Sequence, residues 1–191
     1  MWSLADFEEA SSRGVSERGL IKAVQDGSEP AVAELFNRHW PNTHRAAYLI
    51  VGDAAAAEDI AQEAFLSALS ALGRFDRRRP FSPWLHRITV NKAIDWSRAR
   101  AVRGEVAASP VLLDAVGSEP PLDESLGDSG EVEAALSALP AEQRAVVVLR
   151  YLLEYTPGEI ARMLELPRGT INSRLRRGLD RLSESFEREG R

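Results

Sequence analysis

Apolar residues recur at intervals of three and four along most of this chain, which is the spacing of one face of an α-helix. In the first half, the segments that show this pattern are residues 16–27, 30–52 and 53–72. Pro41 interrupts the second segment and predicts a break or kink there, because proline lacks the N–H that a helix uses. Strict alternation of apolar and polar residues is not found, so the pattern predicts an all-α fold.

Another helix is expected to begin at Ser82, which can act as its N-cap, with Pro83 at the first helical position. The last third of the chain holds four further helical segments, residues 132–139, 140–153, 156–164 and 168–186.

The third of these segments begins with Thr156, Pro157 and Glu159, which together form the signature of a capping box. A tight break at 165–167 separates it from the last helix. A short helix, a tight turn and a second helix are typical of a helix-turn-helix. The buried stripe of the last helix is expected to contain Ile171, Leu175, Leu179, Leu182 and Phe186.

The composition changes between residues 104 and 130, where prolines, glycines, serines and acidic residues gather without any Lys or Arg. Such a segment predicts a flexible acidic linker. It divides the chain into a disordered tail (1–15), an N-terminal helical domain (16–103), the linker and a C-terminal helical domain (131–187). The predicted architecture is therefore two small helical domains.

The 191 residues carry a formal net charge of −5, so any contact with nucleic acid must come from local basic patches. The absence of cysteine excludes disulfides and cysteine-ligated metals. The N-terminus has acidic residues and no long apolar run, and no segment is apolar enough to cross a bilayer. These features predict a cytoplasmic protein without membrane insertion.

The most basic part of this acidic chain runs from Arg74 to Arg103, where aromatic residues stand among the cations. Cations that follow phosphates, with rings that receive unstacked bases, suit single-stranded nucleic acid. The loop 75–80 precedes a helix that carries Arg87 and Asn91 on one side, and Phe75 can offer a ring to a displaced base. Trp84 is expected to brace the loop, and Trp96 to lie in the core. The alternative is a solvated basic helix with buried aromatics.

The segment 53–72 carries Asp59 and Glu63 on a polar stripe, with Gln62 and Leu66 outside the core-facing arc. Acidic residues beside exposed apolar ones suit docking of a basic partner. A merely solvated acidic face is the commoner explanation of such a stripe.

The open face at the start of the last helix is basic and polar, whereas the opposite face is apolar. A recognition helix places such residues against base edges and phosphates, although a plain Arg-rich surface helix would show the same composition. The residues in question are Arg168, Thr170, Ser173, Arg174, Arg176 and Arg177.

Three motifs in this order resemble those of an extracytoplasmic-function (ECF) sigma factor: DAAAAEDIAQEAFLSAL, RFDRRRPFSPWLHRITVNKAIDWSRAR and YTPGEIARMLELPRGTINSRLRRGLDRL. The resemblance implies a DNA-binding subunit of bacterial RNA polymerase that recognises the −35 and −10 promoter elements and melts the −10 region. It implies that Asp59, Gln62 and Glu63 bind core polymerase, and that the last helix binds the −35 element. For the −10 element it implies Phe75, Arg77, Arg78, Arg79, Trp84, Arg87 and Asn91. An anti-sigma factor becomes a candidate partner.

Two other classes of protein compete with this interpretation. A stand-alone helix-turn-helix regulator would account for the C-terminal domain but not for the basic stretch or the acidic stripe. A carboxylate–metal helical bundle would require Glu-x-x-His pairs on facing helices, and His39, His44 and His86 stand in no such pattern. We therefore expect no metal, no cofactor and no catalytic residues.

Overall fold

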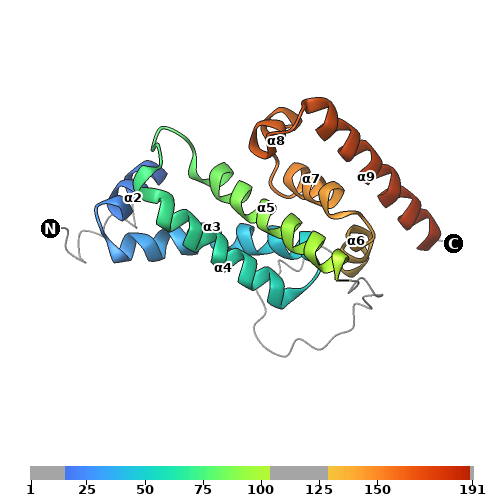
Figure 1. Ribbon diagram of the computed structural model, residues 1–191, viewed down its shortest axis with the longest axis horizontal. Helices are drawn as coiled ribbons and strands as arrows, with labels where there is room; N and C mark the ends of the chain where they lie inside the picture. The colour runs from blue at the N-terminus through green and yellow to red at the C-terminus, as the bar shows by residue number, and fades with distance from the viewer. Residues whose placement is uncertain (1–15, 104–128, 190–191) are drawn as a thin grey trace.

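The computed structural model describes residues 16–103 and 129–189. In these ranges all regular secondary structure is helical, as the hydrophobic pattern predicts (Figure 1). The predicted tail at 1–15 and residues 104–128 of the predicted linker lie outside the described residues. The N-terminal bundle contains α2 (Glu17–Gln25), α3 (Glu29–Val51), α4 (Ala54–Ala71), the 3-10 turn η1 (Leu72–Arg74) and α5 (Phe81–Val102). The C-terminal bundle contains α6 (Ser129–Ser137), α7 (Ala141–Tyr151), α8 (Pro157–Leu164) and α9 (Arg168–Glu189).

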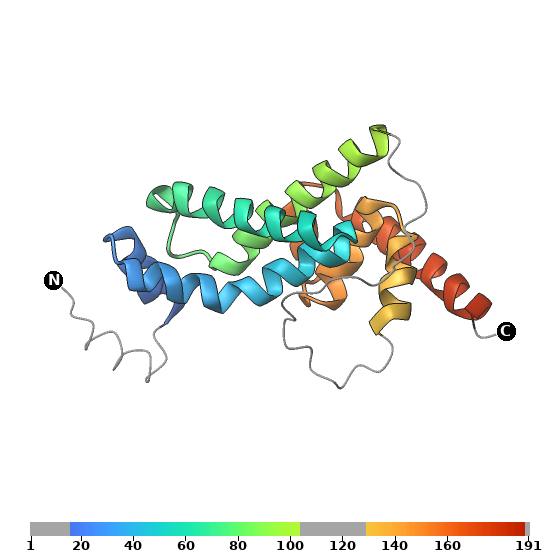
Figure 2. The same cartoon turned by 90° about the horizontal axis from the view of Figure 1, so that it is seen from below.

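Side-chain caps fix where α2, α3 and α4 begin. Ser16, Ser28 and Asp53 each accept a hydrogen bond from a backbone N–H in the first turn of α2, α3 and α4. Helices α3, α4 and α5 then pack lengthwise against one another (Figure 2). The face of α4 predicted to be buried is buried, and consists of Ile60, Ala61, Ala64, Phe65, Ala68 and, just after the helix, Leu72.

Two details of the N-terminal bundle differ from the sequence predictions. The predicted break at Pro41 is wrong, because α3 continues through this residue to Val51. Both halves of α3 bury side chains, and this packing outweighs the loss of one hydrogen bond at an exposed proline. Ser82 is not the cap of α5: the N-cap is Pro80 and the first helical residue is Phe81, each two residues earlier than predicted. The Phe81 side chain is fully buried and fixes this start.

The C-terminal bundle contains the predicted helix-turn-helix. The Thr156 N–H donates to Glu159 Oε2 at 2.8 Å, and the Glu159 N–H donates to Thr156 Oγ1 at 3.3 Å, so the predicted capping box is confirmed. Hydrogen bonding to Thr156 holds the pKa of the Glu159 carboxyl below its usual value. Helix α8 ends at Leu164. Its C-cap is Glu165, whose φ of 55° lies in the left-handed region, and the Leu166 N–H donates to the Ala161 carbonyl.

The buried stripe of α9 is shorter than predicted. Ile171 and Leu175 are buried and Leu182 packs at the edge of the core, but Leu179 is 39% exposed and Phe186 is 40% exposed. The apolar repeat continues along α9 beyond the part that is covered by other helices. Within the described part of the chain α9 packs on α7, α8 and α6, and these contacts leave Leu179 and Phe186 partly exposed.

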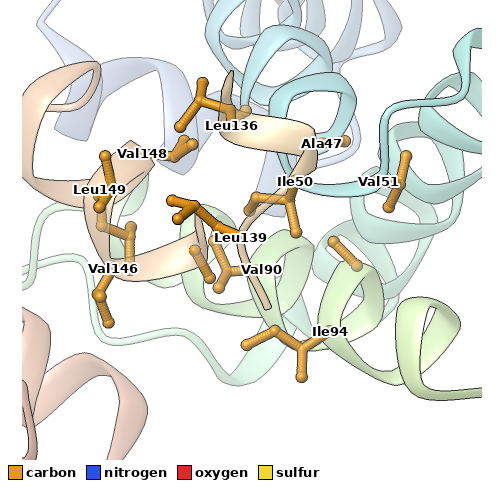
Figure 3. Close-up of a cluster of buried hydrophobic side chains, with 14 of the residues drawn as sticks. Ala47, Ile50, Val51, Val90, Ile94, Leu136, Leu139, Val146, Val148 and Leu149 are labelled. Carbon is orange, nitrogen blue, oxygen red and sulfur yellow. The ribbon is translucent and has the colours of Figure 1, made fainter. Parts of the chain in front are cut away.

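The two bundles are packed against each other through one apolar cluster. Figure 3 shows Ile50 of α3 and Val90 and Ile94 of α5 beside Leu139 and Val146 of the C-terminal bundle. Arg144 of α7 adds polar contacts: its guanidinium donates to the carbonyls of Ile50 at 2.8 Å, Ser137 at 2.6 Å and Leu139 at 2.8 Å. Burial lowers the pKa of Arg144 to about 10, which leaves it charged at neutral pH.

Candidate polymerase and nucleic-acid interfaces

The acidic face of α4 is exposed to solvent. Asp59, Gln62 and Glu63 are all exposed, and Leu66 beside them is 64% exposed, the largest exposed fraction of any leucine in the described residues. Gln62 donates to Glu58 at 3.0 Å, and Glu63 accepts from Lys92 of α5 at 3.0 Å. An apolar side chain at the centre of a polar rim is how protein interfaces are built.

The loop between η1 and α5 presents three arginines, Arg77, Arg78 and Arg79, all of which are exposed. Asp76 folds the loop: its carboxylate accepts from the Arg78 N–H at 3.0 Å, and its carbonyl accepts from the Arg79 N–H at 2.9 Å. The hydrogen bond from the Arg78 backbone holds the pKa of the Asp76 carboxyl below its usual value. The cations therefore stand on an ordered turn.

Aromatic rings support the base of this loop. The Phe75 ring lies 4.6 Å from the Trp84 ring and 5.9 Å from the Phe81 ring, measured between centroids. Phe75 and Trp84 are both half-buried, so each leaves part of a ring accessible. Trp96, expected in the core, is also half-buried and carries the Arg100 guanidinium 5.1 Å above its ring.

Arg87 and Asn91 lie one turn apart on α5, and Asn91 is exposed. Arg87 does not stand free, because its Nη2 atom lies 2.7 Å from Glu165 Oε1 in the turn of the helix-turn-helix. This pair could not be predicted from the sequence, because its members are 78 residues apart.

A second polar contact between the bundles lies next to that pair. His86 Nδ1 is 2.8 Å from the Tyr155 hydroxyl, and Arg98 on the same helix donates to Glu142 of α7 at 2.9 Å. Burial lowers the pKa of His86 to about 4 and raises the pKa of Tyr155 to about 12, so both groups are neutral at neutral pH. The helix that carries the −10 candidates is thus held against the C-terminal bundle.

The first three turns of α9 carry the −35 candidates. Arg168, Arg176 and Arg177 are exposed, whereas Thr170, Ser173 and Arg174 are partly buried. The Ser173 hydroxyl donates to the Thr170 carbonyl at 2.9 Å, so this hydroxyl retains its acceptor capacity. Burial raises the pKa of the Glu142 carboxyl in α7, but a hydrogen bond from its own backbone, then Arg98 and lastly the charge of Arg174 hold this pKa below its usual value.

Among residues 16–103 and 129–189, no group of three or more His, Cys, Asp or Glu side chains is placed to hold a metal ion. None of the helices in these ranges combines the length and the apolar character needed to cross a bilayer.

Comparison with known proteins agrees with this arrangement of surfaces. Residues 35–103 match the family model for sigma-70 region 2, and residues 129–182 match the model for sigma-70 region 4. The ECF RNA polymerase sigma factor SigW of Bacillus subtilis (strain 168) is 34% identical over 177 residues, which cover 87% of this chain and 94% of that protein.

The fold is similar to that of CnrH, solved in complex with the cytosolic domain of CnrY, with a TM-score of 0.66 and 27% identity over 90% of this chain and 97% of that chain. It is also similar to that of the sigma factor RpoE, solved in complex with the anti-sigma factor NepR from Bartonella quintana, with a TM-score of 0.65 and 22% identity over 81% and 96% of the two chains. Both sigma regions and a nearly full-length relative are thus matched. The chain belongs to the ECF RNA polymerase sigma factors, which bind core RNA polymerase and promoter DNA and direct promoter-specific initiation of transcription.

Proposed function

We propose that the loop 75–80 and the exposed face of α5 open the −10 element and hold one flipped base. The observation that carries this proposal is the arrangement of the loop itself, in which three exposed arginines stand on an ordered turn beside two half-buried aromatic rings. The arginines provide charge for the phosphates of the displaced strand. Taking a base out of the stack costs a few kcal/mol, which the protein must offset with new contacts.

Phe75, Trp84 and Asn91 are the candidates for those contacts. Because the Phe75 ring already packs on Trp84, a base would stack on the accessible part of this aromatic pair rather than on an isolated ring. The Asn91 amide is exposed and can both donate to and accept from a base edge. Arg87 would join this face once Glu165 is withdrawn from it.

For the −35 element we propose that α9 enters the major groove with its N-terminal residues against the bases. A bidentate contact from an arginine to guanine favours guanine over another base by about 1–3 kcal/mol. Removing a cation that contacts a phosphate instead weakens binding to all DNA sequences alike. The candidates are Arg168, Thr170, Ser173, Arg174, Arg176 and Arg177. Alanine at each position, tested on matched and mismatched −35 duplexes, distinguishes the two kinds of contact.

For polymerase we propose that Asp59, Gln62 and Glu63 dock α4 on a basic surface of the core enzyme, with Leu66 entering an apolar site. The support is the exposure of the whole group on a helix whose opposite face is buried. Glu63 forms an ion pair with Lys92, so polymerase must either break this pair when it binds Glu63 or contact both side chains.

While the two bundles are packed together, the protein cannot bind both promoter elements at the same time. Their names place the elements roughly 25 base pairs apart, which is roughly 85 Å along B-form DNA at 3.4 Å per pair. Arg87 contacts Glu165, and Arg168 follows Glu165 by three residues, which an extended chain spans in at most about 11 Å. We therefore infer that α5 and α8 separate when the protein binds a promoter with polymerase.

Family membership supports three further parts of the proposal. The protein acts through binding, without catalytic residues of its own, and works in the cytoplasm, where polymerase and promoter are found. An anti-sigma factor is a candidate regulator, since a solved relative of the same fold is bound to one.

The proposal for the −10 element is tested with the variants Phe75→Ala and Asn91→Ala. Each should leave helicity and core polymerase binding unchanged and should lower the yield of open complex on duplex promoter DNA, as measured by permanganate reactivity of −10 thymines. A template already unpaired at −10 should restore much of the lost activity, because it removes the cost of unstacking. Wild-type opening by both variants would locate the pocket elsewhere.

A further inference from the structure

Helix α2 contacts both ends of the basic loop, although the contacting residues are 50 and 64 positions apart in the chain (Figure 1). Its last residue, Gln25, contacts the segment that enters the loop, and its first residue, Glu17, contacts the start of α5, where the loop ends. Helix α2 also lies outside residues 35–103, the part of the chain that matches sigma-70 region 2.

At the entry to the loop, the side-chain amide of Gln25 bridges two backbone carbonyls. Its Nε2 atom donates to the Leu72 carbonyl at 2.8 Å and to the Phe75 carbonyl at 3.3 Å. The Leu72 carbonyl also accepts from the Phe75 N–H at 3.0 Å, which closes η1. One partly buried amide thus fixes the direction in which Phe75 leaves the turn.

At the exit from the loop, the Glu17 side chain caps the N-terminus of α5 in place of the N-cap residue itself. Pro80 is the N-cap of α5 and has no side chain that could accept from the first turn. Glu17 Oε2 instead accepts from the Phe81 N–H at 3.3 Å, and Glu17 Oε1 lies 3.4 Å from the Ser82 hydroxyl. A carboxylate at this position also interacts favourably with the positive end of the helix dipole.

The environment of Glu17 holds its carboxylate in place. His39 of α3 lies with its Nε2 atom 3.3 Å from Glu17 Oε1, and its Nδ1 atom lies 3.4 Å from the Ser82 hydroxyl. Glu17 is 32% exposed, and His39 is buried against the Phe81 ring. Helices α2, α3 and α5 therefore meet at one polar junction directly behind the loop.

We propose that Glu17 and Gln25 are positioning residues for promoter opening, which hold the loop 75–80 between two fixed ends before DNA arrives. The inference rests on the proposed role of this loop at the −10 element. Neither residue needs to touch DNA, and their effect is to reduce the number of loop conformations that DNA binding would otherwise have to select. Asp76 orders the interior of the same loop, so both its ends and its middle are held.

The test uses full-length protein in holoenzyme with the variants Gln25→Ala, Gln25→Glu and Glu17→Gln. Gln25→Glu keeps the shape of the side chain but removes the amide donor, so it should behave like Gln25→Ala. Lys22→Ala is the matched control, because it removes an exposed pair with Asp26 at the end of the same helix and leaves Glu17 and Gln25 in place. Glu29→Gln is the control for the loss of an exposed carboxylate near a helix start.

Each of the three variants should reduce the rate of open-complex formation on duplex promoter DNA by roughly three- to tenfold, the effect of losing one or two net hydrogen bonds. The controls should match wild type, and a template already unpaired at −10 should restore the variants. Core polymerase affinity should not change. Variants that open duplex DNA at the wild-type rate would overturn the inference.

Loop mobility gives a second measurement that does not depend on DNA. The chain has no cysteine, so Arg79→Cys introduces a single thiol for a spin label in the loop. In this background, Gln25→Ala and Glu17→Gln should increase the mobility of the spin label, whereas Lys22→Ala should not. A label spectrum that neither Gln25→Ala nor Glu17→Gln changes would overturn the inference. If wild-type holoenzyme itself fails to open −10 DNA, the proposed function fails; if it opens DNA and the variants do so equally well, only the positioning role fails.

Discussion

Acid should weaken the protein through His86, the histidine that faces Tyr155 between the two bundles. Burial lowers the pKa of His86 from 6.5 to about 4, with a smaller contribution from the nearby charge of His39. An unfolded chain therefore binds a proton at His86 more readily than the folded protein does. The contribution of neutral His86 to the free energy of unfolding is fully present above pH 6.5. It is lost as the pH falls from 6.5 toward about 4, the pKa of His86 in the folded protein.

The expected loss is large relative to the stability of a typical domain. At about 1.4 kcal/mol for each pH unit between the two pKa values, the full effect is roughly 3 kcal/mol. Most of it, roughly 2–2.5 kcal/mol, should be lost between pH 7 and pH 4.5. The His86 ring contacts Tyr155, so separation of the bundles is one way to relieve the cost.

Urea denaturation at pH 7 and pH 4.5 measures this effect in wild type and in His86→Gln. The variant has no proton to bind at this position, so its loss of unfolding free energy should be smaller than that of wild type by roughly 2 kcal/mol. His44→Gln is the control, because it changes a half-buried histidine that stacks on Trp40 and leaves His86 in place. Equal losses in wild type and His86→Gln would refute the reasoning.

Three further substitutions test other parts of the structure. Thr156→Ala removes the cap of α8 and should lower the free energy of unfolding by about 1 kcal/mol in urea denaturation; an unchanged midpoint would contradict the capping role. Gly178→Val adds a branched side chain where a Cβ atom would lie 3.1 Å from Val147 Cγ2, and should destabilise the packing of α7 on α9 by about 1–3 kcal/mol; a melting temperature at or above that of wild type would show that Val147 can move aside. Asp59→Lys should weaken core polymerase binding, measured by fluorescence anisotropy, more at low salt than at high salt and without loss of helicity; wild-type affinity would remove Asp59 from the interface.

Local features of this fold could be predicted from the sequence because their causes are local. The capping box at Thr156 and Glu159 depends on residues three apart, and the core face of α4 depends on helical spacing alone. The all-α class and the helix-turn-helix follow from such patterns. The start of α5 was predicted two residues late, because burial of Phe81 decides it and a cap at Ser82 does not.

What could not be predicted depends on contacts between segments far apart in the chain. The pairs Arg87–Glu165 and His86–Tyr155 join the two bundles across 78 and 69 residues. Glu17 and Gln25 appear in the sequence as ordinary polar residues of a short amphipathic helix. Their importance comes from the position of α2 behind the loop, which no periodicity reports. The exposure of Leu179 could not be predicted for the same reason. The apolar repeat of α9 does not show how far along the helix the neighbouring helices cover it.

Separating the two bundles returns the apolar side chains around Ile50, Val90 and Val146 to water unless another surface covers them. Burial of apolar surface lowers the heat capacity of a complex, and exposure raises it. The heat-capacity change on assembly with polymerase is therefore the difference between two burials, one lost within the chain and one gained between chains. Calorimetry over a range of temperatures would measure it, and a value near zero would mean that polymerase covers about as much apolar surface as the second bundle had covered.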